Sequence, residues 1–437
     1  MSEAIQSSGR LKLHTKILIG LVLGIVFGVA ANRILGPGNW QVEWINTYVA
    51  GPLGQIFLRM LFMVVMPLVF ASIALGVAGL GDIRHVGKVG GKAIGYFLVT
   101  TAMAATLGLI VVNLMRPWER VTPETRAELM ERFRGDASSR VEAAATTARF
   151  GPETFVNIVP RNPIDAAART DMLGVIFFGV MFGAALTLIP AAKAKPMLDW
   201  LEALNEVVVR IIRFAMSLAP FGVAALIFVV ASRFGFDLLM AVAAFVITVL
   251  LALLLHVAGT LFAIIRFAIG LNPLLFLARV RAAVITAFST SSSSATLPTA
   301  MEVAENRLGV PRRLAGFVLP IGSTMCMNGT AIFEGITVIF LAEIFGVDLT
   351  LPQMAIVMVM AVITAVGAAG VPGGSIPLLV GILLMFGVPG EGIAIVIGVD
   401  RILDMSRTTV NVFGDLTAVT WVAKSEGVWS PKDVPKV

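Results

Sequence analysis

Long apolar runs follow one another along most of this 437-residue chain. The first covers residues 17–35, and a helix that rises about 1.5 Å per residue would cross the hydrocarbon core of a bilayer over that length. The run follows a short basic segment and lacks a small-residue cleavage site, so we expect a retained helix rather than a signal peptide. The chain is therefore predicted to pass through a membrane repeatedly.

The composition agrees, since 57% of residues are hydrophobic and 14% are charged, with a mean hydropathy of +0.92. These values exclude an ordinary water-soluble globule and a disordered chain. The net charge of +6 does not suggest nucleic-acid binding, because the basic residues lie in short segments between apolar runs. With the single cysteine Cys326, no intramolecular disulfide is possible.

Eight membrane helices are expected. They cover residues 17–35, 44–80, 93–115, 172–192, 201–232, 236–270, 314–345 and 392–423. Several are long enough to be tilted or broken. The basic residues at 84–92, 193–195, 266–313 and 424–436 all fall on one side, which predicts a cell-membrane protein with both termini in the cytoplasm. The polar insert at 116–171 would then face outward.

Two further apolar stretches, 272–299 and 351–390, do not fit full crossings. Each has two short apolar arms around a polar or Gly/Pro-rich tip. Irregular backbone at membrane depth is tolerated where protein or a water-filled cavity surrounds it, so we expect two re-entrant helical hairpins. Interrupted segments repeated in this way are typical of inverted-repeat transporters, although an ion channel also uses re-entrant loops.

The last predicted helix carries a row of polar residues. Asp400, Asp404, Arg407, Asn411 and Asp415 are spaced by 4, 3, 4 and 4 residues and share one face of a helix. Ionisable residues within a membrane segment are costly, so such a row is expected to face protein or water and to have a function. Structural ion pairs between helices are the alternative interpretation. The excess of carboxylates over arginine favours a bound cation such as Na⁺.

Arg407 and Asp404 together suit a zwitterionic ligand. A guanidinium binds a carboxylate, and an aspartate binds an ammonium group. A second ligand carboxylate could bind hydroxyls and free N–H groups at the serine-rich tip at 291–294. An acidic amino acid satisfies all three, whereas a plain dicarboxylate would leave Asp404 unpaired.

At these residues the chain resembles the glutamate transporter family, the dicarboxylate/amino acid:cation symporters. The resemblance rests on four segments and extends over nearly the whole chain. They are the tip SSSSATLP at 291–298, Asn328-Gly329-Thr330, Gly370-Val371-Pro372-Gly373, and the polar row from Asp404 to Asp415.

The resemblance implies a homotrimer with an elevator mechanism. Scaffold helices 1 and 2 would lie in residues 1–91, and an extracellular insert with scaffold helices 4 and 5 in 116–235. The mobile transport domain would comprise helix 3 at 92–115 and residues 236–437, which hold helix 6, hairpin 1, helix 7, hairpin 2 and helix 8.

The resemblance also implies two sets of ligand-binding residues. The substrate set is Ser291, Ser293, Thr330, Val371, Ser375, Asp404, Arg407, Thr408 and Asn411. Two Na⁺ sites would use Gly322, Cys326, Asn411 and Asp415, and Thr324, Ala365, Val366 and Ala368. Most of these Na⁺ ligands are backbone carbonyls.

Two departures from the family pattern concern ions. Where members with a third Na⁺ site have an Asn and an Asp, this chain has Cys326 and Asn328, and Phe97 replaces an aromatic hydroxyl beside Thr100 and Thr101. Without that carboxylate a third Na⁺ is not expected.

Glu305 and Glu334 stand where proton-coupled members carry acids. A buried glutamate can carry a proton, which makes H⁺ coupling a further expectation. The alternative interpretation is that Glu305 is a solvated loop residue beside Arg307 and Arg312.

The predicted function is symport of aspartate or glutamate with Na⁺ and H⁺. A C4-dicarboxylate symporter of the same fold and an ion channel are the alternatives. An enzyme is not expected, because the sequence has no nucleophile elbow, zinc-binding motif or phosphate-binding loop.

Overall fold

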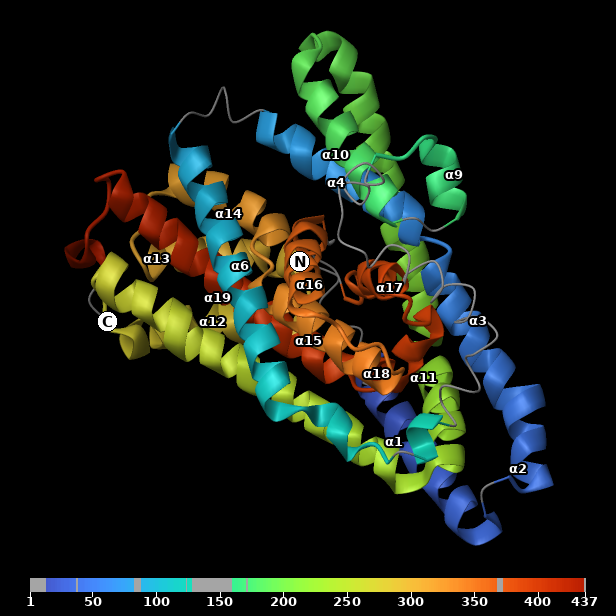
Figure 1. The fold of residues 1–437 in the computed structure, drawn as a ribbon. Helices are drawn as coiled ribbons and strands as arrows, with labels where there is room; N and C mark the ends of the chain where they lie inside the picture. Colours follow the sequence, from blue (N-terminus) through green and yellow to red (C-terminus); the bar gives the residue numbers. More distant parts are fainter. Residues whose placement is uncertain are drawn as a thin grey trace, which may run out of the picture.

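The computed structural model describes residues 13–36, 38–81, 88–122, 124–127, 159–169, 172–367 and 372–435. Within these ranges every regular element is a helix (Figure 1). The all-helical architecture expected from the apolar runs is therefore observed over the described part of the chain.

The first half of the chain forms long helices joined by short irregular ones. They are α1 (Leu13–Leu35), α2 (Trp40–Ile45), η1 (Asn46–Ala50), α3 (Gly51–Phe62), α4 (Val65–Gly81), α6 (Lys88–Met115), η2 (Pro117–Arg120), α9 (Pro163–Ala168), α10 (Met172–Leu188) and α11 (Ala191–Leu255).

The second half contains shorter, more interrupted helices. They are η3 (His256–Leu261), η4 (Ile264–Ile269), α12 (Pro273–Thr290), α13 (Ser293–Asn306), α14 (Arg312–Met325), α15 (Asn328–Ile344), α16 (Leu351–Gly367), α17 (Ile376–Met385), η5 (Gly390–Ile393), α18 (Ala394–Ile397), α19 (Asp400–Ser425) and η6 (Pro431–Asp433).

Seven helical stretches in the described residues are long and apolar enough to cross a membrane. They are Thr15–Leu35, Trp40–Leu75, Val89–Arg120, Ala191–Gly235, Leu238–Ile269, Pro273–Thr290 and Arg312–Ile344. The set differs from the eight predicted spans, because it includes one arm of the first predicted hairpin and leaves out α10 and α19. α10 has 17 residues, and α19 carries the polar row.

Two long predicted spans are broken, as their length led us to expect, and another is wrong at its start. The expected helix at 392–423 is broken, since η5 and α18 precede α19, which begins at Asp400. The expected helix at 44–80 is interrupted by a turn after Phe62. The expected helix at 201–232 begins earlier, at Ala191. Apolar composition reveals a segment but does not locate the turns within it.

Helices α1 and α11 pack closely because α1 presents a row of glycines to α11. A Cβ on Gly20 would lie 2.3 Å from the carbonyl oxygen of Pro220, and one on Gly24 would lie 2.6 Å from that of Ala224. Gly28 continues the row at the same four-residue spacing. Small residues at this spacing let membrane helices approach to backbone contact.

A break at Gly235 divides α11 into two helices. Gly235 has a φ of 63°, which favours glycine, and interrupts the helical hydrogen bonds there. Asn32 at the end of α1 replaces them, since its Nδ2 donates to the carbonyls of Ser232 (3.0 Å) and Arg233 (3.2 Å). The two predicted helices, 201–232 and 236–270, are separated at this point.

The two segments predicted as hairpins each contain paired helices. α12 packs against α13, and the chain turns at Ser291, whose φ of 51° lies in the left-handed region. Ser292 caps α13 by accepting the N–H of Ala295 at 3.1 Å. α16 packs against α17 in the second segment.

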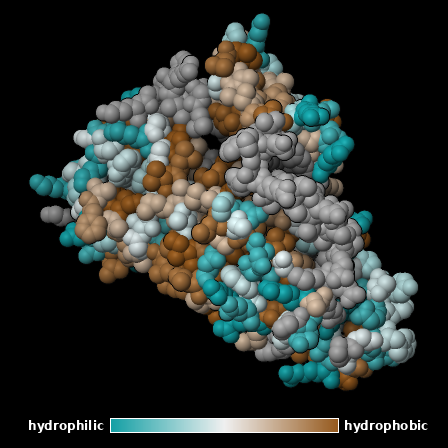
Figure 2. Space-filling model, in the orientation of Figure 1, coloured by the Kyte–Doolittle hydropathy of each residue, from teal (hydrophilic) through white to brown (hydrophobic). Residues whose placement is uncertain are grey.

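Helix α15 lies at the centre of the molecule. Apart from Glu343, each of its residues is buried, and α6, α16 and α19 pack around it (Figure 1). Figure 2 shows apolar side chains gathered over the middle of one face, with hydrophilic ones toward its left edge and lower end. Exposed Phe27, Phe221 and Phe267 are side chains that a lipid environment would cover.

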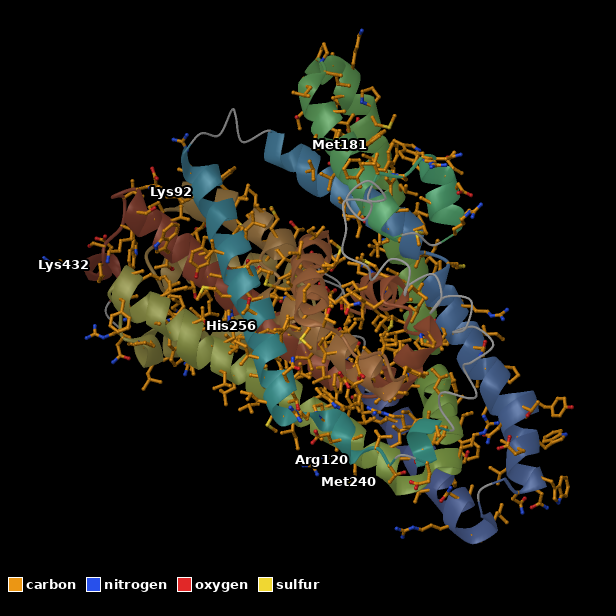
Figure 3. All side chains as sticks on the ribbon, in the orientation of Figure 1. Lys92, Arg120, Met181, Met240, His256 and Lys432 are labelled. Atoms are coloured by element: carbon orange, nitrogen blue, oxygen red, sulfur yellow. The ribbon has the colours of Figure 1, made fainter. Side chains whose placement is uncertain are left out.

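Side chains fill the space among these helices (Figure 3). His256, labelled there at the start of η3, is fully buried, and neither ring nitrogen has a hydrogen-bond partner in the structure as described.

Candidate substrate and cation site

The polar row of α19 is buried in protein. Asp400, Asp404, Arg407, Asn411 and Asp415 have exposed fractions of 5, 8, 1, 4 and 3%. α12, α14 and α15 pack against α19 and shield it. The row therefore faces the interior of the protein and not lipid.

Arg407 is the centre of an ion-pair cluster. Its Nη2 donates to Asp400 Oδ1 at 2.9 Å and to Asp404 Oδ1 at 3.0 Å, and its Nη1 donates to Ser375 Oγ at 3.2 Å. The guanidinium carbon lies 3.9 Å from the centre of the Phe333 ring, which adds a cation–π contact. One guanidinium is thus shared by two carboxylates and by the residue that precedes α17.

The second oxygen of Asp404 has different partners. The N–H of Gly373 donates to Asp404 Oδ2 at 3.2 Å, and Arg401 Nη1 lies 3.8 Å from the same atom. Gly373 has a φ of 73°, so its N–H is presented by a turn that favours glycine. Asp404 therefore connects α19 to the segment before α17.

Asn411 connects α19 to the start of α15. Its Oδ1 accepts the N–H of Gly329 at 2.7 Å, and its Nδ2 donates to Thr330 Oγ1 at 3.2 Å. Gly329 is one of the first residues of α15, where backbone N–H groups lack helical partners. Thr408, three residues before Asn411 on α19, is also buried.

The serine-rich tip contacts the break between α14 and α15. Ser293 Oγ donates to the carbonyl of Ser323 at 2.6 Å. Ser291 is 1% exposed, and its Oγ has no hydrogen-bond partner among the described residues. The tip therefore holds an unsatisfied hydroxyl close to a helix end, a combination that suits an anionic ligand group.

The residues predicted for one Na⁺ site meet around Asp415. Its Oδ1 is buried without a hydrogen-bond partner in the described chain, and a Cβ on Gly322 would lie 2.4 Å from that atom. The Gly322 carbonyl accepts the N–H of Cys326, where α14 ends. A carboxylate oxygen beside backbone carbonyls at a helix end fits a hard cation such as Na⁺.

The second predicted Na⁺ set is only partly described. Thr324 lies in α14 and Ala365 and Val366 in α16, and these two helices pack against each other. Ala368 lies outside the described residues, as does Val371 of the predicted substrate set. Within the described part, no group of three or more His, Cys, Asp or Glu side chains gathers, so a Na⁺ site here would have to use mainly backbone carbonyls.

Asn328 occupies a neutral hydrogen-bonded cluster. Thr101 Oγ1 donates to Asn328 Oδ1 at 2.9 Å, and Thr100 Oγ1, which donates to the carbonyl of Tyr96 at 2.9 Å, lies 3.3 Å from Asn328 Oδ1. All three side chains are buried, and buried Phe97 lies one helical turn before Thr100 on α6. This amide oxygen already accepts the Thr101 hydroxyl, and, unlike a carboxylate, it carries no net charge to attract a further cation.

The two candidate proton carriers lie in different surroundings. Glu334 on α15 is fully buried, and its Oε2 accepts the hydroxyl of Thr364 at 2.7 Å, whereas its Oε1 has no partner in the described structure. The Glu305 side chain is 24% exposed and lies 4.0 Å from Arg312 Nε. Glu305 lies in the last turn of α13, so it is not a loop residue as the alternative interpretation supposed, although its partly exposed ion pair fits a structural role.

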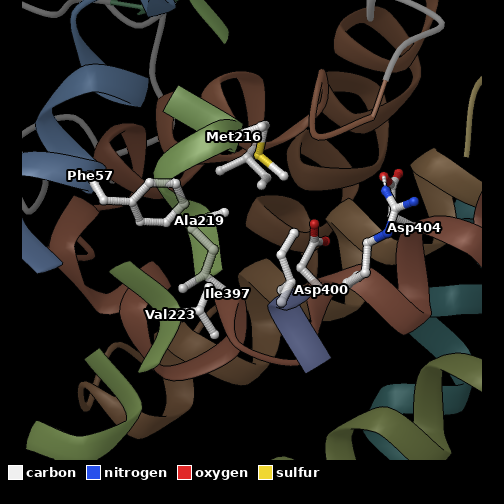
Figure 4. Close-up of a pocket in the computed structure, with 10 residues that line it drawn as sticks. Phe57, Met216, Ala219, Val223, Ile397, Asp400 and Asp404 are labelled. Atoms are coloured by element: carbon white, nitrogen blue, oxygen red, sulfur yellow. Dashed lines mark ion pairs between the residues drawn. The ribbon is translucent and has the colours of Figure 1, made fainter. Parts of the chain in front are cut away.

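A small cavity lies beside the cluster (Figure 4). Its volume is about 10 Å³, enough for about one water molecule. Residues of α17–α19 line one side, including Asp400, Arg401 and Asp404. The opposite side is apolar and comes from α1, α3 and α11: Ile17, Phe57, Met216, Ala219 and Val223. In this arrangement Asp400, Asp404 and Ser375 occupy the Nη groups of Arg407, while the Nε atoms of Arg401 and Arg407 have no hydrogen-bond partner in the described structure.

Three residues of the site lie outside the predicted ligand set. Asp400 and Arg401 are ionisable residues in an apolar segment, a signal that the sequence does carry. Phe333 has no such signal, because an aromatic residue in an apolar helix is ordinarily a packing residue.

Known proteins are similar to this chain over nearly its whole length. A family model described as the sodium:dicarboxylate symporter family matches residues 13–425. The chain is 36% identical over 420 residues to the proton/sodium-glutamate symport protein of Bacillus subtilis (strain 168), covering 96% of this chain and 94% of the relative.

Two further relatives differ in the substrates that their names give. The proton/glutamate-aspartate symporter of Escherichia coli (strain K12) is 34% identical over 95% of this chain and 93% of its own length. The C4-dicarboxylate transport protein of Bacillus subtilis (strain 168) is 32% identical over 95% of both chains. Amino-acid and dicarboxylate carriers are thus similar to this chain to nearly the same degree.

Proposed function

Because the chain belongs to the sodium:dicarboxylate symporter family, we propose that it imports aspartate or glutamate together with Na⁺ and H⁺. It is a multi-pass membrane transporter rather than an enzyme. The named activities of its relatives support this substrate class and these coupling ions.

One observation carries the substrate assignment: buried Arg407 is flanked by Asp400 and Asp404 and by the Ser375 hydroxyl. A ligand carboxylate would replace the aspartates on Arg407, and the ligand ammonium would take the Asp404 carboxylate that Arg407 releases. Ser291, Ser293, Thr330, Thr408, Asn411 and Val371 are the further proposed substrate contacts.

Binding requires the cavity to open, since a volume of about 10 Å³ cannot hold an amino acid. The cavity separates α1, α3 and α11 from α17–α19. This division coincides with the proposed scaffold, residues 1–91 and 116–235, and the proposed transport domain, residues 92–115 and 236–437. An elevator-like displacement of one group past the other, in a homotrimer with its basic loops in the cytoplasm, would open it.

For the cations, we assign one Na⁺ to Asp415 with carbonyls of Gly322, Cys326 and Asn411. The unsatisfied Asp415 Oδ1 supports this assignment. A second Na⁺ would use carbonyls of Thr324, Ala365, Val366 and Ala368. The neutral cluster of Asn328 with Thr100 and Thr101 argues against a third.

For the proton, Glu334 is the better candidate than Glu305. It is buried beside the cluster on α15 with one oxygen unpartnered among the described residues, whereas Glu305 has an arginine partner at the surface. Taking up a proton would neutralise an otherwise costly buried charge.

Uptake into proteoliposomes tests the proposed function. Radiolabelled L-aspartate should accumulate under an inward Na⁺ gradient, accumulate further when an inward H⁺ gradient is added, and stop accumulating when ionophores collapse both. An ion channel would instead give currents in the absence of substrate. Failure to concentrate L-aspartate or L-glutamate under either gradient would overturn the proposal, and concentration of a C4-dicarboxylate alone would favour the alternative.

A further inference from the structure

We propose that Arg401 determines how well this transporter accepts a dicarboxylate that lacks an ammonium group. The inference rests on the proposed function, because it concerns the partner of Asp404 in the same site. It begins from the 3.8 Å separation between Arg401 Nη1 and Asp404 Oδ2.

Arg401 is a positively charged side chain of the site itself. It lies one turn before Asp404 at the start of α19, is 8% exposed, and lines the cavity that Asp400 and Asp404 also line. Its Nε has no hydrogen-bond partner among the described residues, and the opposite cavity wall is apolar. In the described structure, Asp404 is the acid with which Arg401 forms an ion pair.

The charges of the cluster balance because Arg401 is there. Asp400 and Asp404 supply two negative charges, and Arg401 and Arg407 supply two positive ones. When a ligand carboxylate draws Arg407 away, Asp404 loses its closest cation. A ligand ammonium would replace that cation, but a dicarboxylate brings no such group.

Arg401 remains beside Asp404 in both cases. Residues three apart on one helix are neighbours, so this pair can persist while Arg407 changes partners. A buried carboxylate without a partner is costly, and Arg401 spares Asp404 that cost when the ligand is a dicarboxylate. The same contact makes the ligand ammonium less necessary. The chain should therefore bind both kinds of acid, with Arg401 selectively supporting the dicarboxylate.

Titration calorimetry on purified protein in Na⁺ buffer tests this inference, with L-aspartate and succinate as probes. The wild type should bind both. Arg401→Gln should weaken succinate binding by about tenfold or more, because Asp404 then lacks a cation, and should weaken L-aspartate binding far less. Arg210→Gln is the matched control, since it removes an exposed arginine of α11 outside the cavity, and it should leave both affinities unchanged.

A second background separates pairing with Asp404 from a general loss of positive charge. In an Asp404→Asn protein there is no carboxylate for Arg401 to neutralise, so adding Arg401→Gln should leave succinate affinity nearly unchanged. An equal loss of succinate affinity in both backgrounds would overturn the inference. Arg401→Lys keeps the charge and should keep succinate binding, and loss of succinate binding in that variant would also contradict the inference.

The two proposals fail differently. A wild type that binds L-aspartate but not succinate overturns the role of Arg401 and leaves the proposed function standing. A wild type that binds neither overturns the proposed function and this inference with it.

Discussion

Gly329 on α15 and Arg407 on α19 are in backbone contact: a Cβ built on Gly329 would lie 2.6 Å from the carbonyl oxygen of Arg407 and 2.8 Å from its Cα. The same Gly329 donates its N–H to Asn411. The absence of a side chain at Gly329 thus sets the distance between the two helices that carry most of the site.

Gly329→Ala should therefore push α15 away from α19. Backbone atoms cannot yield as a flexible side chain does, so we expect a loss of about 1–3 kcal/mol of stability and a loss of L-aspartate uptake. Thermal unfolding in detergent and uptake assays measure the two effects. Gly95→Ala on α6 is the control, because a Cβ there meets nothing within 4 Å. Equal behaviour of the two variants would contradict the close-contact interpretation.

Arg407→Ala should abolish uptake of acidic amino acids. The substitution removes the guanidinium that is proposed to bind the substrate carboxylate. It also leaves Asp400 and Asp404 without their shared partner, and breaking a buried pair costs roughly 3–5 kcal/mol. Because about 1.4 kcal/mol corresponds to a tenfold change in affinity, we expect L-aspartate affinity to fall by at least about a hundredfold. Arg210→Ala, at an exposed position of α11, should retain uptake. Unchanged uptake in Arg407→Ala would show that the pocket is assigned to the wrong place.

Asp415→Asn should raise the Na⁺ concentration needed for half-maximal L-aspartate binding. The amide keeps the shape of the side chain but removes the charge whose free oxygen faces Gly322. Saturating Na⁺ should restore part of the binding. The exposed Asp199→Asn variant, which breaks an ion pair with Lys195, should not alter the Na⁺ requirement. If Asp415→Asn also leaves it unaltered, Asp415 does not bind Na⁺.

Glu334→Gln should remove the effect of an H⁺ gradient while uptake driven by Na⁺ continues. Glutamine can still accept the Thr364 hydroxyl, so the packing of α15 is preserved while the titratable group is lost. Uptake under separate gradients measures this directly. Glu305→Gln is the comparison, and the opposite pattern, in which it alone removes the H⁺ effect, would move proton coupling to Glu305.

The helical spacing of α19 already predicts its polar row, because residues three and four apart share a helix face whatever surrounds them. The serine-rich and Gly/Pro-rich tips likewise indicate local breaks that the structure contains around Ser291 and Gly373. These features are local, and a single sequence expresses them directly.

Long-range contacts are not expressed in that way. Asn32 satisfies the carbonyls of Ser232 and Arg233 from 200 residues away, and nothing in the spacing of α1 indicates it. The pairing of Ser375 with Arg407 and the stacking of Arg407 on Phe333 also depend on how separate helices meet.

The central claim is that one site holds an acidic amino acid together with its cations. Equilibrium binding of L-aspartate to the purified wild-type protein across a range of Na⁺ concentrations, with choline keeping the ionic strength constant, tests it most directly. Because each ligand binds the state that the other stabilises, L-aspartate affinity should rise steadily with Na⁺. An affinity that is the same in Na⁺ and in choline at every pH would contradict the account.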